Sequence, residues 1–223
     1  MKTSISVTVL AAAMTTLVIG DPQPPVGTLT AKHNTVISGS LPTLTWSVTH
    51  PSRDIDNIVK IESDGDVVTK NKVRVDVYML GTSVSTDYGQ TQHEITTQID
   101  LGSGYQDFFT GEGKDVVPSD VLISGVVPAG TKINFRAYFT EWVDNKSEQV
   151  IVLKDDDAPP AQLVKNGATY QENYLSGLLR NSKLDMGPFD LIYCVELTHT
   201  DKNSSGYDLQ DCIVLLRFTE IDY

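Results

Sequence analysis

Residues 188–218 read PFDLIYCVELTHTDKNSSGYDLQDCIVLLRF, and this stretch carries the clearest structural pattern in the chain. Two apolar runs, DLIYCVEL and CIVLLRF, flank a polar segment rich in Asp, Asn, Ser and Gly. Runs of β-branched and aromatic residues bounded by turn formers are typical of strands. The stretch therefore predicts two antiparallel strands joined by an acidic loop, with Cys194 in the first strand and Cys212 in the second.

Segments on the N-terminal side alternate with the period of two that half-buried strands show. They read TLTWSVT at 43–49, NKVRVDVYML at 71–80 and KINFRAYF at 132–139. In the last of these, Ile133, Phe135, Ala137 and Phe139 fall on one face. Helical periods are scarce, and Gly, Pro, Asn and Ser separate the segments. We therefore expect an all-β fold, an antiparallel immunoglobulin-like β-sandwich with a small C-terminal β unit.

The composition changes abruptly at KDDDAPPAQL, residues 154–163, where charge and proline replace the strand pattern. Such a change is typical of a boundary between structural units. The expected organisation is a signal peptide at 1–20, a Pro-rich segment at 21–27, a β-sandwich at 28–155 and a C-terminal β unit at 156–223.

The first twenty residues have the order of a secretory signal peptide. Lys2 precedes an apolar run, and Val18 and Gly20 provide the small residues that a cleavage site needs. The alternative is a buried first strand or helix, but PQPPVG follows at once and cannot continue a helix. We expect a secreted or cell-surface protein without a transmembrane segment, and cleavage after Gly20.

The formal net charge is −12 at pH 7. A surface of this sign repels nucleic acid and anionic lipid, so neither is an expected partner. It favours solubility and the binding of cations. Much of the acidity is also what a solvated extracellular surface needs, without any ligand.

Each apparent enzyme motif in the sequence lacks a residue that its chemistry requires. No catalytic residue is therefore assigned, and no enzymatic activity is expected. GEGK at 111–114 is not a phosphate loop, because Asp115 stands where Ser or Thr is needed. His93-Glu94 begins like a zinc-protease motif, but Thr97 replaces the second histidine. The acid pairs Asp54/Asp56 and Asp64/Asp66 lie among turn formers such as Asn57 and Gly65, so they are better explained as turn residues than as glycosidase carboxylates.

The loop between the two C-terminal strands is a candidate Ca²⁺ site. Hard oxygen ligands on a turning backbone suit Ca²⁺, and the first half of this loop has EF-hand-like spacing. The candidate ligands are Asp201, Asn203, Ser205, Asp208 and Asp211. Cys212 occupies the place of the bidentate Glu at position twelve. The alternative is a hairpin loop with solvated acids.

The last quarter of the chain resembles a C-terminal β module of secreted bacterial proteins, whose function is unassigned. The matching elements are Tyr174-Leu175, the G-P-x-D-x-I-Y step from Gly187 to Tyr193, Glu196-Leu197, and the Y-D-L-Q-D run that leads into the apolar strand. The last run is also similar to the D-[FY]-N-D signature of calcium-associated β modules, with Leu209-Gln210 as a departure. The resemblance implies a secreted β module without enzymatic activity.

A disulfide between Cys194 and Cys212 is the expected state in an oxidising compartment. Antiparallel pairing of the two strands would bring the cysteines opposite each other. In the resembling module these positions are usually aliphatic, so a double replacement by Cys suggests a bridge. Closing this loop would contribute about 3 kcal/mol. The alternative is two buried free thiols.

The loop GYQDFFTGEGKDVVPSD carries the aromatic residues Tyr105, Phe108 and Phe109. They could contact a ligand, or fold back onto the core. The favoured function is a binding or structural role at a bacterial surface or matrix, with an unknown protein or glycan as partner. The alternative is a carbohydrate-binding accessory module or a glycoside hydrolase-like enzyme. An exposed aromatic platform would favour the accessory module, and an open sheet edge would favour assembly or adhesion.

Overall fold

A computed structural model describes residues 26–32, 43–49, 54–86, 91–163 and 175–221. The chain forms two compact units, which divide near His50. In the first unit, β1 (Val26–Lys32) and β2 (Thr43–Thr49) pair as an antiparallel hairpin in which Leu29 lies opposite Trp46. Trp46 therefore belongs to this hairpin and not to the sheets of the second unit. The predicted signal peptide lies outside the described residues.

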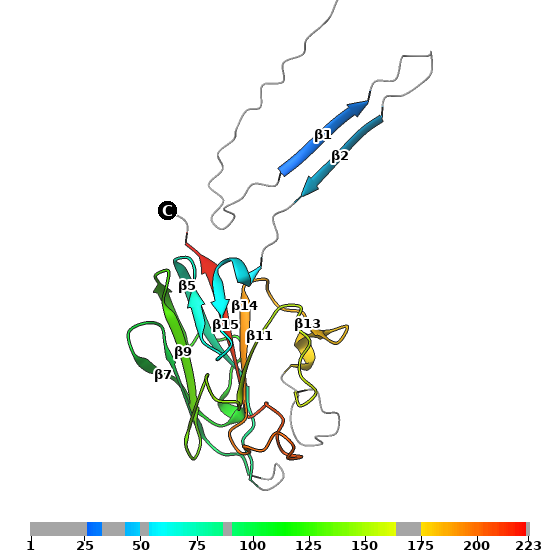
Figure 1. The fold of residues 1–223 in the computed structure, drawn as a ribbon. Helices are drawn as coiled ribbons and strands as arrows, with labels where there is room; N and C mark the ends of the chain where they lie inside the picture. Colours follow the sequence, from blue (N-terminus) through cyan, green and yellow to red (C-terminus); the bar gives the residue numbers. More distant parts are fainter. Residues whose placement is uncertain (1–25, 33–42, 50–53, 87–90, 164–174, 222–223) are drawn as a thin grey trace, which may run out of the picture. The chain divides into compact units, whose positions relative to one another are not determined.

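The described residues of the second unit form two large antiparallel sheets and one small two-stranded hairpin (Figure 1). The first has the order β3-β4-β9-β6-β7, and β10 pairs with β9 beside β4. Its strands are β3 (Val59–Ile61), β4 (Val67–Thr69), β6 (Ile95–Asp100), β7 (Tyr105–Gly111), β9 (Lys132–Tyr138) and β10 (Trp142–Asp144). The second has the order β11-β14-β15-β5-β8. Its strands are β5 (Val73–Thr82), β8 (Ile123–Val127), β11 (Val150–Lys154), β14 (Asp190–Val195) and β15 (Cys212–Glu220).

One face of each sheet contributes to a common hydrophobic core. Alternate residues of β9 are buried there, and so are alternate residues of β5. Phe135 of β9 stacks on Tyr193 of β14 with ring centroids 5.0 Å apart, which joins the two layers directly. The prediction of an all-β antiparallel sandwich is confirmed, and the predicted inward face of Ile133, Phe135 and Ala137 is correct.

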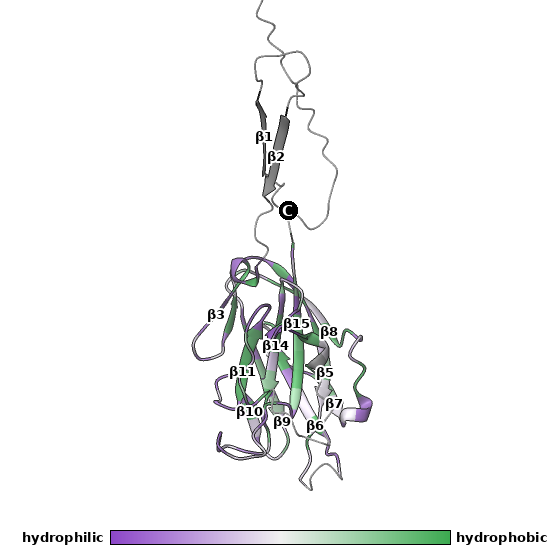
Figure 2. Cartoon of the chain, turned by 90° about the vertical axis from the view of Figure 1, so that its right-hand side faces the viewer, coloured by the Kyte–Doolittle hydropathy of each residue, from purple (hydrophilic) through white to green (hydrophobic). Residues whose placement is uncertain are grey.

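The other face of the five-stranded sheet is buried as well. Figure 2 colours the strands by hydropathy, and β11 and β15 of this sheet are largely in the hydrophobic colour. Ile192, Cys194, Ile213 and Leu215 pack there against residues from three covering segments. The covering side chains are Leu163, Leu175, Leu184, Tyr207 and Leu209. Short elements carry part of this cover: the 3-10 helix η3 (Ser176–Leu178) and the hairpin of β12 (Leu179–Arg180) and β13 (Lys183–Leu184). Every residue of β14 is consequently buried.

The C-terminal strands are central to the sandwich. β14 and β15 lie between β11 and β5, and their inward residues belong to the core between the sheets. The expected unit at 156–223 thus shares its core with the preceding strands instead of forming a separate layer. The reason is visible in the sequence: DLIYCV has no polar face, and a strand without a polar face needs neighbours on both sides. The described part of the chain contains no long apolar helix able to cross a bilayer.

The predicted disulfide does not form. Val195 lies opposite Cys212, and Cys194 lies opposite Ile213, so the two cysteines are one register step apart. One step turns a side chain to the other face of a sheet. Cys212 therefore faces the core between the sheets and Cys194 the covered outer face, and both are free thiols. Burial raises the pKa of both thiols.

Candidate functional site

The predicted calcium ligands fall into an exposed group and an inner group. Asp201, Asn203 and Ser205 are exposed at the far end of the loop. Oδ1 of Asp201 accepts hydrogen bonds from the backbone N–H and the side-chain amide of Asn203, at 2.9 and 3.1 Å. These contacts form a local turn. Asp208 and Asp211 lie deeper, where a further carboxylate meets them.

That further carboxylate is Glu196, which is fully buried directly after β14. Oε1 of Glu196 accepts from Thr198 N at 3.0 Å, Thr198 Oγ1 at 2.6 Å and His199 N at 2.9 Å. Oε2 accepts from Asp208 N at 2.9 Å. One side chain thus holds both ends of the acidic loop. From the sequence, Glu196 is a candidate fourth carboxylate for this loop, but alternation puts it on the face of Cys194, which would point it into the sheet. Its role as the acceptor at both ends of the loop was not predicted.

Asp211 completes the inner group. Its Oδ2 accepts from Leu197 N at 2.7 Å and Thr198 N at 3.1 Å, and its carboxyl is also hydrogen-bonded to Glu196. Burial and the neighbouring Glu196 raise the pKa of Asp211 well above its usual value. Burial acts in the same direction on Glu196, but its many donors lower its pKa overall. Of the two carboxyl groups, Asp211 is therefore the one on which these surroundings favour a proton.

Carboxylate oxygens of Glu196, Asp208 and Asp211 lie within 4.8 Å of one another. The structure therefore brings together two of the five predicted ligands, with Glu196, which is not one of those five. Asp201 is not a member of this group. Hydrogen bonds already occupy both oxygens of Glu196. Calcium binding at this loop stays a prediction.

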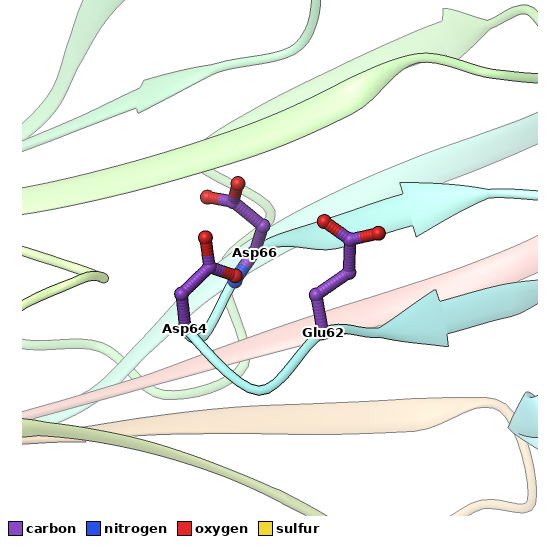
Figure 3. Close-up of side chains that lie close together, drawn as sticks. All are labelled: Glu62, Asp64 and Asp66. Atoms are coloured by element: carbon purple, nitrogen blue, oxygen red, sulfur yellow. The ribbon is translucent and has the colours of Figure 1, made fainter.

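A second acidic group lies on the turn between β3 and β4, where Glu62, Asp64 and Asp66 approach one another (Figure 3). Gly65 makes this turn possible, because its φ is +83° and a Cβ atom there would lie 2.1 Å from the carbonyl oxygen of Asn145. Asp66 is buried. The turn was predicted from the sequence, whereas the burial of Asp66 was not.

Two lysines and one asparagine surround the buried carboxylate of Asp66. Lys132 donates to Oδ2, Asn145 donates to Oδ1 at 2.9 Å, and Lys146 Nζ lies 3.8 Å from Oδ2. Burial acts to raise the pKa of Asp66, but these partners together lower it. An open hollow of about 360 Å³ adjoins the turn and is lined on its other sides by Lys146, Glu148 and Lys202, among others. With its buried member already paired to lysine, the acidic turn has a structural explanation.

Aromatic residues gather on the outward side of the six-stranded sheet. We call the group of Tyr105, Arg136, Tyr138 and Trp142 the aromatic patch. The three rings are 38–42 % exposed. The Arg136 guanidinium lies 4.0 Å from the ring centroid of Tyr105 and 4.2 Å from that of Trp142, and the rings of Tyr138 and Trp142 are 5.2 Å apart. The four side chains form a connected surface on β7, β9 and β10.

Strand register explains why these residues meet. Trp142 lies opposite Tyr138, and Arg136 lies opposite both Gln98 of β6 and Asp144 of β10. Nε of Arg136 donates to Oε1 of Gln98 at 2.6 Å, which fixes the guanidinium between the rings. The patch is therefore held by paired strands and not by a loose loop.

Carboxylates surround the aromatic patch. Gln98 Nε2 donates to Asp107 at 2.5 Å, and Asp100 lies opposite Tyr105 in the β6–β7 register. Burial raises the pKa of the Tyr105 phenol most, Asp144 and Asp100 raise it further, and Arg136 acts against them. The electrostatic potential at the Tyr105 phenol is therefore partly due to Asp100 of β6 and Asp144 of β10.

Of the three aromatic residues predicted to contact a ligand, only Tyr105 is exposed. Phe108 is buried in the core and Phe109 packs against it, as the alternative interpretation expected. Tyr138 and Trp142 were missed. The signal was available, because the alternation that turns Phe135 inward turns Arg136 and Tyr138 outward.

Comparisons with protein-family models, curated proteins and solved structures found no match for this chain. Its function therefore has to be inferred from the chemistry of its own side chains.

Proposed function

We propose that this chain is a secreted β-sandwich protein that acts by binding a partner at a cell surface or in the extracellular matrix, and that the aromatic patch contacts the partner. The observation that carries the proposal is the gathering of Tyr105, Tyr138 and Trp142 around Arg136 on one sheet face. Secretion is supported by the composition of the first twenty residues.

The residue types of the patch favour binding. Trp, Tyr and Arg are the side chains most enriched where binding energy concentrates in protein interfaces. Each ring gives a large apolar area with a polar edge, and few rotamers are lost on binding. Single exposed apolar residues are normal on a protein surface and need no explanation. Four such side chains in contact on one face favour an interaction site.

The support beneath the patch favours a preformed site. Phe135 and Ala137 flank Arg136 in β9, and their side chains are buried in the core on the opposite face of the sheet. Arg136 is stacked and hydrogen-bonded before any ligand arrives. Because a preorganised side chain loses little conformational entropy on binding, more of the contact energy appears as affinity.

The test measures how the secreted full chain adheres to producing cells and to extracellular matrix. We expect Trp142→Ala and Tyr138→Ala each to weaken binding by about tenfold, the usual effect of truncating an interface anchor. Val126→Ala is the matched control, because Val126 is also about half exposed but belongs to β8 of the other sheet. Unchanged binding of both aromatic variants would refute the proposal.

A further inference from the structure

We propose that the partner bound by the aromatic patch is a basic polypeptide segment, whose Lys or Arg side chains lie over Tyr138 and Trp142 while surrounding carboxylates pair with its charges. This inference depends on the proposed function, because it names the chemical class of the partner at the same surface.

Local charge is the first argument. Asp107 and Asp144 lie on strands that carry the patch, Asp100 lies opposite Tyr105 on the adjacent strand β6, and Glu141 directly precedes Trp142. Arg136 is the cation placed among them, and its charge already lies between two rings. The acids thus outnumber the cation, on a chain whose net charge is −12. Such a field attracts basic partners and repels acidic ones.

Neighbouring lysine does not reverse this balance. Lys132 is the next cation along β9, and it donates to the buried carboxylate of Asp66. Its charge is thus compensated inside the protein.

The rings supply the second argument. Aromatic faces attract cations, and the chain already makes this contact within itself, since the Arg136 guanidinium lies 4.2 Å from the Trp142 centroid. Tyr138 and Trp142 remain about two-fifths exposed, so part of each ring is open to a ligand. A Lys or Arg side chain of a partner would repeat the internal contact there. Its charge would lie near Asp144, two residues from the Trp142–Tyr138 pair in the register and on the same face of the sheet.

Other ligand classes fit the surroundings less well. An acidic ligand would gain Arg136 but would meet the surrounding carboxylates. A neutral saccharide could stack on the rings, as the sequence criterion for an accessory module expects, and its hydroxyl groups could donate to the carboxylates. The negative field would nevertheless not attract it, whereas it attracts a basic segment. These classes separate by salt dependence, because only a charged partner loses affinity as ionic strength rises.

The binding experiment uses Trp142 as the reporter. The chain has two tryptophans, so Trp46→Phe leaves Trp142 as the single indole. The probes are an oligolysine peptide, an oligoglutamate peptide of equal length and a neutral oligosaccharide. We expect oligolysine alone to change the Trp142 fluorescence in a saturable way, with an affinity that falls as salt is added. Saturable binding of the oligosaccharide, with no effect of oligolysine, would overturn the inference.

Charge variants separate a specific site from general attraction to an acidic protein. Asp107→Asn with Asp144→Asn removes two charges at the patch and keeps the oxygens that accept from Gln98 and from Lys146 N. We expect about three- to tenfold weaker oligolysine binding, as loss of ion pairs and a weakened cation–π contact imply. The control, Asp120→Asn with Asp156→Asn, removes the same charge from two exposed loop positions. Equal losses in both double variants would overturn the inference.

The two proposals fail in different ways. If Trp142→Ala leaves adhesion to cells and matrix unchanged, the proposed function is wrong. If Trp142→Ala abolishes adhesion while the patch charge variant adheres normally, the aromatic patch binds a partner that is not basic, and only the present inference is wrong.

Discussion

At Gly65 the fold depends on the absence of a side chain. A Cβ there would lie 2.1 Å from the Asn145 carbonyl oxygen, and the backbone also has φ +83°. We expect Gly65→Ala to lower the free energy of unfolding by about 3 kcal/mol or more, because left-handed strain and a backbone clash add. Gly130→Ala is the matched control, with φ +80° and nothing within 4 Å, and should cost only about 1 kcal/mol. Equal losses in urea unfolding would contradict the clash.

Asp66 predicts a pH dependence of stability. The pKa of Asp66 is lowered in the folded protein. The carboxylate therefore adds to the free energy of unfolding above the unfolded pKa, and this addition disappears as pH falls through the folded pKa. We expect Asp66→Asn to reduce stability by about 1–3 kcal/mol at neutral pH, with the difference from wild type shrinking in acid. Urea unfolding across pH measures this. The exposed neighbour Asp64→Asn should change stability by no more than about 0.5 kcal/mol, and a flat difference across pH would contradict the role of Asp66.

At the scale of the element, β14 and β15 determine the state of the cysteines. Because Cys194 and Cys212 face opposite sides of the sheet, we expect two thiols to react with a thiol reagent after unfolding and almost none before. The raised pKa of each thiol also lowers the fraction of reactive thiolate in the folded protein, which slows the reaction further. Reductant should leave the melting temperature unchanged. A melting temperature that falls on reduction would show that a disulfide forms after all.

The loop that follows β14 allows a direct test of calcium binding. If Ca²⁺ binds at Asp208 and Asp211, mass action raises the melting temperature of wild type in Ca²⁺ relative to chelator. We expect that rise, and expect Asp208→Ala to remove it. Identical melting temperatures in the two solutions would mean that the hydrogen bonds to Glu196 hold the loop without metal.

Individual elements differ in how far the sequence determines them. In β9, polar residues alternate with Ile133, Phe135 and Ala137, so both the strand and its inward face could be predicted. In β14, apolar residues occupy both faces, so the sequence does not show which residues face which side of the sheet. The register of Cys194 against Ile213 could therefore not be predicted, and the disulfide prediction failed there. The aromatic patch needed the pairing of β9 with β10, which sequence does not specify over so short a strand.

At the scale of the whole molecule, the two units predict how the chain can be divided. Residues 51–223 contain both sheets and both hydrophobic clusters. We expect this fragment to unfold in one cooperative transition, because β14 and β15 contribute side chains to both clusters and so couple them. A fragment ending at residue 155 lacks β14 and β15, so β11 loses its partner β14 and β5 loses its partner β15, and we expect it not to fold. Circular dichroism with denaturant measures both, and cooperative unfolding of the shorter fragment would contradict this account.

The pairing of β5 with β15 has a consequence for how the protein is made. Thr82 and Asp211 are hydrogen-bonded although 129 residues separate them in the chain. During synthesis β5 therefore emerges long before its central partner exists, with apolar residues on both of its faces. Pairings this distant form slowly, and an unpaired strand of this kind is prone to aggregate. The edge of β5 that pairs with β15 therefore stays open until the strands of residues 190–220 arrive to close the sheet.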